Sequence, residues 1–375
     1  MDSSLPEPSP QARAASRALT ERVGTELSSH RNWISFARYM ELALYEPGLG
    51  YYAGGAAKLG QAGDFVTAPE LGPLFGRVLA RQLGVLLEPG AAILEFGAGS
   101  GALAESLLEA LPAGQPYFIV EPSAELAERQ RARLGARARW LDRLPASFRG
   151  VVLANEVVDA MPVHALAWSR DGIAERGVCA HDGTLAWSER PAAGAVLAAA
   201  RGIDLEPPSS GRYESELGLA GRAWIAALAG MLEAGAILVV DYGFPAREYY
   251  HPQRAMGTLM CHYRHRAHGD PFFLPGLQDI TAHVDFSALA HAAADAGLDV
   301  LGYASQADFL LNCGIADILG AEDASDARRY APLAAQAQKL LSPAEMGELF
   351  KVLALGRGVR SPLTGFTRAD RSHTL

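Results

Sequence analysis

The spacing of the hydrophobic positions changes near residue 91. Before this point, apolar residues recur every three or four positions over 17–28, 34–44 and 70–86, which predicts helices with one buried face. After it, short apolar runs alternate with helical stretches, a pattern typical of βαβ units and a parallel sheet. The predicted strands are 91–96, 117–121, 136–140, 151–155, 236–242, 298–304 and 350–356, with helices expected at 102–111, 123–134 and 286–296.

Two insertions interrupt this pattern. Roughly 80 residues separate the fourth and fifth strands, too many for one crossover helix. Their alternating stretches predict a small antiparallel unit followed by a helix at 215–232. The expected organisation is a flexible tail and helix start over 1–30, a helical and loop lid region over 31–90, a sheet domain over 91–356 with insertions at about 162–215 and 243–285, and a tail over 357–375.

Composition excludes several classes of protein. The net charge of −9 and the absence of any Lys/Arg-rich run make nucleic acid an unexpected partner. None of the three lysines precedes Ser or Thr, so a Walker A phosphate loop is ruled out. The three widely spaced cysteines predict reduced thiols. No apolar run is long enough for a membrane span and the first residues are polar, so we expect a cytoplasmic protein of bacterial type.

A glycine turn after the first predicted strand is the most informative segment. Glu95 lies near the end of that strand, and Gly97, Gly99 and Gly101 lead into a helix. Glycines allow a tight turn and let a ligand approach the bare backbone at a helix N-terminus. Glu121, at the end of the next strand, is placed to accept hydrogen bonds from ribose hydroxyls. The spacing therefore predicts a nucleoside ligand.

Two nucleosides fit this turn. Gly97, Gly99 and Ala102 satisfy the GxGxxA pattern of nicotinamide dinucleotide sites, whereas the full segment has an acidic residue that leads into GxGxG, so S-adenosylmethionine is the second candidate. Glu95 favours the second, because its carboxylate would attract a cationic amino-acid tail and repel a pyrophosphate. Asp142, after the third strand, is a candidate acceptor for an adenine amino group, although a plain surface position fits it equally well.

The fourth predicted strand ends in a second polar motif. Asn155, Glu156 and Asp159 follow it at the carboxyl edge of the sheet, where open α/β folds place their ligands. Two carboxylates at this edge can orient and polarise a nitrogen nucleophile. The alternative is that Glu156 and Asp159 cap the first turn of a short helix.

Histidines are frequent in the second insertion, but they do not predict a metal site. His262, His265 and His268 are three residues apart, which puts neighbours on opposite faces of a strand. His283, beside Asp285, is instead a candidate for hydrogen bonding to a substrate. Motifs of the HExxH, GxSxG and EF-hand types are absent, which removes the usual support for a hydrolase.

These residues resemble the MidA-type methyltransferases, whose mitochondrial member is an arginine methyltransferase required for assembly of respiratory complex I. The resemblance spans about residues 33–356 and rests on motifs at 45–52, 63–70, 95–101, 155–164, 278–286 and 309–315. It implies a class I, Rossmann-like α/β methyltransferase fold: a mostly parallel seven-stranded sheet with an antiparallel last strand, helices on both faces, and an inserted substrate subdomain. It also implies S-adenosyl-L-methionine as donor and S-adenosyl-L-homocysteine as product.

The resemblance further implies a protein arginine as acceptor, with a respiratory complex subunit as one candidate partner. Glu156 and Asp159 would then hold the guanidinium, with Asn155 and His283 as further site residues. The motif at 63–70, which contains Asp64 and Thr67, is expected to fold over the donor and exclude water. A small-molecule methyltransferase, a nicotinamide oxidoreductase and a donor-binding scaffold without catalysis stay open as alternatives. The oligomeric state is not readable from the sequence.

Overall fold

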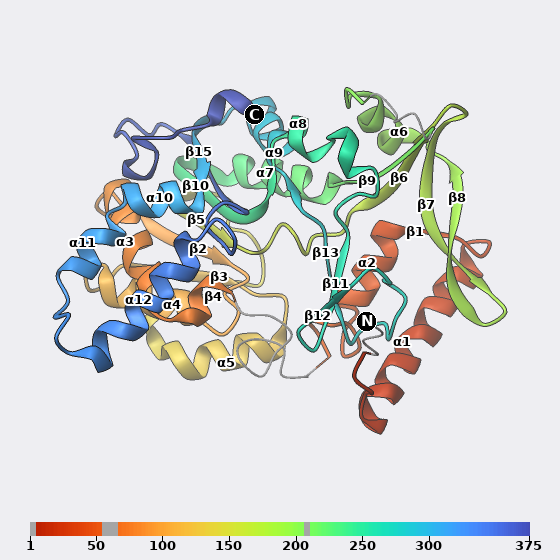
Figure 1. The fold of residues 1–375 in the computed structure, drawn as a ribbon, viewed down its shortest axis with the longest axis horizontal. Coiled ribbons are helices and arrows are strands. Elements are labelled where there is room, and N and C mark those ends of the chain that lie inside the picture. The colour runs from red at the N-terminus through yellow and green to blue at the C-terminus, as the bar shows by residue number, and fades with distance from the viewer. Residues whose placement is uncertain (1–4, 55–66, 206–210) are drawn as a thin grey trace. The chain divides into compact units, whose positions relative to one another are not determined.

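The chain forms two compact units in the computed structural model, which describes residues 5–54, 67–205 and 211–375 (Figure 1). The accessory unit comprises Met1–Phe65, Asp159–Gly221 and Ala246–Val284. The sheet unit comprises Val66–Val158, Arg222–Pro245 and Asp285–Leu375. Across the described residues, none of the helices has both the length and the apolar character of a membrane span.

A mixed sheet organises the sheet unit. Its strands are β2 (Ala92–Phe96), β3 (Tyr117–Val120), β4 (Arg139–Trp140), β5 (Phe148–Asn155), β10 (Leu232–Phe244), β14 (Val284–Asp285), β15 (Asp299–Ser305) and β16 (Phe350–Arg357). The order is β15–β16–β10–β5–β2–β3–β4, and β14 pairs with β10 as an eighth strand. The pairs from β10 to β4 are parallel, whereas β16 is antiparallel to both β10 and β15. The prediction of a mostly parallel seven-stranded sheet is therefore confirmed only in part, because the sheet is mixed and has an eighth strand.

Apolar runs explain the central strands. Leu238 and Val240 of β10 belong to the core that includes side chains of α3 (Leu74–Leu86), α4 (Ala102–Ala110), α10 (Gln306–Asn312), α11 (Ile315–Gly320) and α12 (Ala327–Leu341). The alternate residues Ile237 and Val239 are also fully buried, and α9 (Phe286–Asp295) contacts β10 and β16. Both faces of β10 are thus covered, which is why it is continuously apolar.

The accessory unit contains two antiparallel sheets. One has the order β1–β7–β6–β9, with β8 paired to β7, and the other has the order β12–β11–β13. Their strands are β1 (Ile34–Ser35), β6 (His164–Ser169), β7 (Gly172–His181), β8 (Thr184–Pro191), β9 (Arg212–Leu217), β11 (Met260–Tyr263), β12 (Arg266–His268) and β13 (Asp279–Thr281). The helices are α1 (Pro10–Ser29), α2 (Phe36–Tyr45), α6 (Gly194–Arg201) and α8 (Ala246–Tyr249). The antiparallel strands predicted in the first insertion are therefore present.

Three predicted helices have different bounds, for local reasons. α1 begins at Pro10 rather than at residue 17, because the Ser9 side chain accepts a hydrogen bond from Ala12 N and proline suits the first helical turn. The helix predicted at 70–86 is a 3-10 turn, Ala68–Leu71, followed by α3, since Gly72 has a φ of 141°. The helix predicted at 215–232 is wrong in its first residues: β9 pairs with β6 up to Leu217, and α7 (Leu219–Met231) follows.

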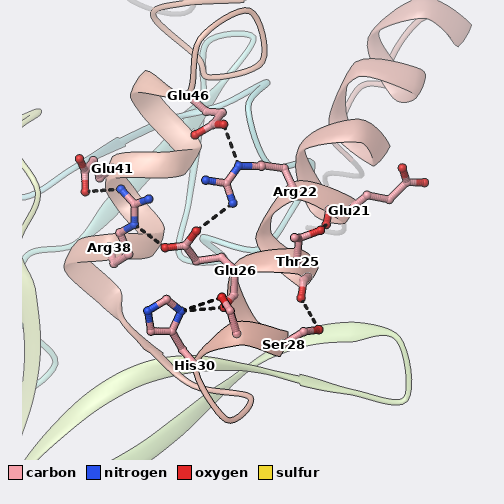
Figure 2. A network of polar contacts seen from close by, with 11 residues as sticks. Glu21, Arg22, Thr25, Glu26, Ser28, His30, Arg38, Glu41 and Glu46 are labelled. Carbon is pink, nitrogen blue, oxygen red and sulfur yellow. Dashed lines mark hydrogen bonds and ion pairs between the residues drawn. The ribbon is translucent and has the colours of Figure 1, made fainter.

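An ion network joins α1 and α2 within the accessory unit (Figure 2). Arg22 contacts Glu26 at 2.9 Å and Glu46 at 2.8 Å, and Arg38 contacts Glu26 at 3.0 Å. Hydrogen bonds from Arg38 and then Arg22 lower the pKa of Glu26. Glu46 belongs to the 45–52 motif, so the network positions the first residues of that motif.

Candidate functional site

The glycine turn has the backbone conformation that its sequence predicts. Gly97, Gly99 and Gly101 have φ angles of 59°, 55° and 82°, a region that side-chain-bearing residues rarely adopt. A Cβ on Gly97 would lie 3.1 Å from Val157 Cγ2. The turn between β2 and α4 is therefore bare backbone, which is what a closely approaching ligand requires.

Ser100 ties this turn to two other segments. Its hydroxyl donates a hydrogen bond to Glu70, and Arg133 donates to Ser100 Oγ at 2.7 Å and to Ser100 O at 3.1 Å. Glu70 is the last residue of the 63–70 motif, so the end of that motif contacts the turn directly. Thr67 O accepts a hydrogen bond from Glu70 N at 3.0 Å, and Asp64 lies outside the described residues.

Gln130 of α5 (Ala124–Leu134) connects the two predicted ligand-binding segments. It is fully buried, and its Nε2 donates to Glu121 Oε2 at 2.8 Å and to Gly99 O at 2.9 Å. Its Oε1 accepts a hydrogen bond from Trp140 Nε1 at 2.9 Å. Sequence reasoning missed this residue, although a glutamine on the buried face of a crossover helix, between Ala127 and Leu134, is a usable signal.

Both acidic residues expected to face the ligand have raised pKa values. Burial raises the pKa of Glu121, against hydrogen bonds from Ser123 N and Gln130. Glu95 lies inside β2 and is 2% exposed, and its Oε2 accepts a hydrogen bond from Tyr117 at 2.8 Å. Burial raises the pKa of Glu95 to about 8; the hydrogen bond from Tyr117 opposes this shift and the charge of Glu121 adds to it. A cation bound beside Glu95 would favour its charged form.

Asp241 positions the loop after β5. Fully buried at the end of β10, it accepts hydrogen bonds from Val157 N at 3.2 Å, Val158 N at 2.9 Å and Tyr242 N at 2.9 Å. Sequence reasoning did not select Asp241. The available signal was an acidic residue near the carboxyl end of an apolar strand, the same signal that selected Glu95.

Asn155 ends β5, and Glu156 begins this loop. Glu156 is half-buried, has a φ of 54°, and donates its N–H to Val240 O at 2.9 Å. Asn155 Nδ2 donates to Glu156 Oε1 at 3.2 Å, while the buried Oδ1 of Asn155 accepts no hydrogen bond from the part of the chain that is described. Turns and bends, not a helix, occupy 156–161, so the helix-capping alternative for Glu156 and Asp159 is wrong.

The other residues that the sequence predicts for the site are Asp142, Asp159 and His283. Asp142 is exposed, two residues beyond the end of β4. Asp159 and His283 belong to the accessory unit. Asp159 is 6% exposed and its backbone oxygen accepts a hydrogen bond from Ala282 N at 3.0 Å. His283 N donates to Thr258 Oγ1 at 3.1 Å.

Sequence reasoning missed Glu216, a buried carboxylate that is linked to His283 through Thr258. Thr258 donates to Glu216 Oε2 from its hydroxyl at 2.9 Å and from its backbone N–H at 2.8 Å. Burial raises the pKa of Glu216. Glu216 lies on β9, in the stretch expected to be helical, so no sheet position was assigned to it.

Among the residues that the structure describes, no group of three His, Cys, Asp or Glu side chains could hold a metal ion.

Three motifs meet in the accessory unit. Tyr45 donates its hydroxyl hydrogen to Ala160 O at 2.9 Å, and Tyr52 donates to Asp279 Oδ1 at 2.9 Å. These two bonds join the 45–52 motif to the motifs at 155–164 and 278–286. Segments far apart in the sequence therefore build one cluster of polar and aromatic side chains.

Known proteins similar to this chain include methyltransferases. A family model described as putative S-adenosyl-L-methionine-dependent methyltransferase matches residues 74–304. A solved structure, a likely methyl transferase from Burkholderia thailandensis bound to S-adenosyl-homocysteine, is 52% identical with a TM-score of 0.94, covering 99% of this chain and 100% of that one. The mitochondrial protein arginine methyltransferase NDUFAF7 of Danio rerio is 27% identical over 90% of this chain and 89% of its own length. The Homo sapiens protein of that name is 28% identical, over 86% and 80%.

Proposed function

The chain belongs to the family of S-adenosyl-L-methionine-dependent methyltransferases and uses S-adenosyl-L-methionine as its cofactor, and from this premise we propose that it methylates a guanidinium nitrogen of a protein arginine. The names of the mitochondrial relatives support arginine as the acceptor. The observation that carries the proposal is the loop after β5, in which Asp241 holds the backbone that presents the half-buried Glu156. A respiratory complex subunit, implied by the sequence resemblance alone, is one candidate partner.

The sheet unit has the chemistry that the cofactor requires. We assign the bare backbone of Gly97, Gly99 and Gly101 to the cofactor's close approach, and the Glu121 carboxylate to its ribose hydroxyls. The buried Oδ1 of Asn155 offers an acceptor with no protein donor among the described residues.

The remaining assignments concern the ends of the cofactor. Glu95 faces the cationic amino-acid tail, Asp142 the adenine amino group, and Asp64 and Thr67 belong to the segment that excludes water. When bound, the cofactor supplies an electrophilic methyl group on a sulfonium.

The protein's own contribution is positioning and electrostatics. An arginine side chain is protonated at ordinary pH, so one nitrogen must present a lone pair while charge is drawn to the others. We assign this role to the carboxylate of Glu156 in the sheet unit, with Asn155 beside it, and we propose Asp159 and His283 of the accessory unit as further groups that bind the acceptor. The nitrogen forms a bond to the methyl carbon, the carbon–sulfur bond breaks with its electron pair on sulfur, and one proton leaves the nitrogen for solvent.

Transfer of labelled methyl groups to proteins tests this function. A lysate of the source organism that lacks this gene receives the purified chain and labelled S-adenosyl-L-methionine, and acid hydrolysis identifies the methylated amino acid. We expect methylarginine with the wild type and about 100-fold slower labelling with Glu156→Gln, at unchanged affinity for S-adenosyl-homocysteine. The exposed Glu345→Gln is the matched control. Absence of labelled protein, or labelling of a metabolite instead, would contradict the proposal.

A further inference from the structure

The 45–52 motif forms a stacked pair of tyrosines. The rings of Tyr45 and Tyr52 lie 5.5 Å apart with an interplanar angle of 22°. The chain returns over the end of α2, because Tyr51 N and Tyr52 N donate to Ala43 O at 2.9 Å and Leu44 O at 2.8 Å. Both stacked tyrosines are half-buried rather than fully enclosed.

The turn by which the chain returns over the end of α2 requires glycine at position 50. A Cβ on Gly50 would lie 2.6 Å from the backbone nitrogens of Tyr45 and Glu46. Two other constraints act on the pair: Glu46 is bound by Arg22, and the edge of Tyr51 contacts Tyr52 at 5.0 Å and 80°. These contacts hold the two rings in their stacked arrangement.

Carboxylates lie next to this aromatic surface. Tyr52 donates its hydroxyl hydrogen to Asp279, which is 2% exposed. Burial raises the pKa of Tyr52 well above its ordinary value, and the charges of Asp279 and Asp159 add to the shift. Tyr52 thus stays protonated and remains a donor to Asp279. On the other ring of the stack, the Tyr45 hydroxyl bonds the backbone oxygen of Ala160, the residue after Asp159.

An aromatic face beside carboxylates is suited to one kind of cation. A guanidinium is planar and weakly hydrated and stacks on rings, whereas an ammonium is a compact, strongly hydrated charge. We propose that the Tyr45–Tyr52 stack and Asp279 form a guanidinium-binding surface that selects arginine over lysine in the acceptor. The rings contact the guanidinium, and Asp279 is a positioning residue that orients Tyr52 and supplies negative charge. This inference rests on the proposed function and deepens it.

Peptide binding tests the surface without turnover. The full chain, saturated with S-adenosyl-homocysteine, is titrated calorimetrically with a glycine-flanked peptide containing one arginine, and with matched lysine and citrulline peptides. We expect the wild type to bind the arginine peptide about 5-fold or more tighter than either analogue. Tyr52→Leu should abolish this preference, Tyr52→Phe should retain part of it, and Asp279→Asn should weaken the arginine peptide but not the neutral citrulline peptide.

Control measurements separate recognition from folding. Tyr213→Phe removes a hydroxyl that donates to His251 O elsewhere in the accessory unit, and it should leave the preference unchanged. Each variant must keep its affinity for S-adenosyl-homocysteine and its cooperative thermal unfolding. An equal affinity of the wild type for all three peptides, or a preference that survives Tyr52→Leu, would overturn the inference.

The labelling assay distinguishes the proposed guanidinium-binding surface from the proposed arginine methylation. Methylarginine that forms equally well with Tyr52→Leu would leave the function standing and overturn the binding surface. Conversely, a Tyr52-dependent preference for the arginine peptide in a protein that labels no arginine would support the surface and contradict the methyl-transfer proposal.

Discussion

The Asp241 carboxylate accepts a hydrogen bond from Val158 N at 2.9 Å, so the end of β10 holds the loop that follows β5. Because Asp241 is fully buried and also bonds Val157 N and Tyr242 N, it acts as a backbone support rather than a surface charge. The conformation of the loop that begins at Glu156, directly after Asn155 at the end of β5, depends on it.

We expect Asp241→Asn to destabilise the protein by about 1–3 kcal/mol, because the amide nitrogen would face backbone N–H groups as a second donor. Affinity for S-adenosyl-homocysteine should also fall, since Asn155 directly precedes the supported loop. Chemical denaturation and calorimetry measure the two effects. The exposed Asp299→Asn should change neither by more than a few tenths of a kcal/mol. A fully stable Asp241→Asn protein would contradict this support role.

Gln130→Leu should weaken donor binding, although Gln130 itself is assigned no contact with the donor. The substitution removes hydrogen bonds to Glu121 and Gly99 and leaves buried polar atoms unpaired, at a cost of about 1–3 kcal/mol. Titration with S-adenosyl-homocysteine is the measurement, and the exposed Gln338→Leu is the control. Unchanged affinity would mean that Glu121 is positioned without Gln130.

The raised pKa of Glu95 predicts a pH dependence of stability. The folded protein holds a proton on Glu95 below its pKa of about 8, whereas the unfolded chain releases it near the ordinary value of 4.5. Between these values the folded state binds more protons, so this group's contribution to the free energy of unfolding falls as pH rises. Denaturation between pH 5 and pH 9 should show a steeper fall in the free energy of unfolding for the wild type than for Glu95→Gln, because the variant lacks the contribution of Glu95 while that of Glu121 stays. The exposed Glu88→Gln should keep the wild-type slope.

The same group predicts proton release on ligand binding. The cationic amino group of S-adenosyl-homocysteine, placed beside Glu95, should lower its pKa and expel a proton near pH 7. Calorimetry in buffers of different ionisation enthalpy counts that proton. Glu95→Gln should bind without releasing it. If the wild type also releases none, Glu95 does not face the cationic tail.

We expect Gly97→Ala to strain the backbone and to lower stability, whereas the same substitution at Gly84 should not. The φ of 59° costs an alanine about 1 kcal/mol or more, and its Cβ would press on Val157 Cγ2 at 3.1 Å. Gly84→Ala, inside α3 with no atom within 4 Å of the added Cβ, should instead stabilise by about 0.5–1 kcal/mol. Thermal unfolding of the two variants provides a matched comparison, and equal shifts would contradict the strain argument.

Strand positions were predictable because apolar runs reflect burial within a few neighbouring residues. The expected strands at 91–96, 117–121, 298–304 and 350–356 agree with β2, β3, β15 and β16 to within a residue or two. The prediction at 215–232 failed because the pairing of β9 with β6, more than 40 residues earlier in the chain, overrides local helical spacing.

The conformation of the glycine turn was predictable because residue type marks it. Gly97, Gly99 and Gly101 reveal their positive φ angles through residue type alone, and Glu121 follows at a set spacing. Gln130 and Asp241 were not predictable in the same way. Their roles depend on which backbone and side-chain groups lie across from them once helix and strands have packed.

Residue type and spacing by themselves determined the α/β pattern of this chain and its glycine turn, and they favoured a nucleoside ligand, because these are local properties of the backbone. Tertiary structure alone decided that Tyr52 meets Asp279 across 227 positions and that Asp241 supports the loop after β5. Such contacts depend on how distant segments pack, and no short-range spacing in a single sequence encodes the distance between two side chains.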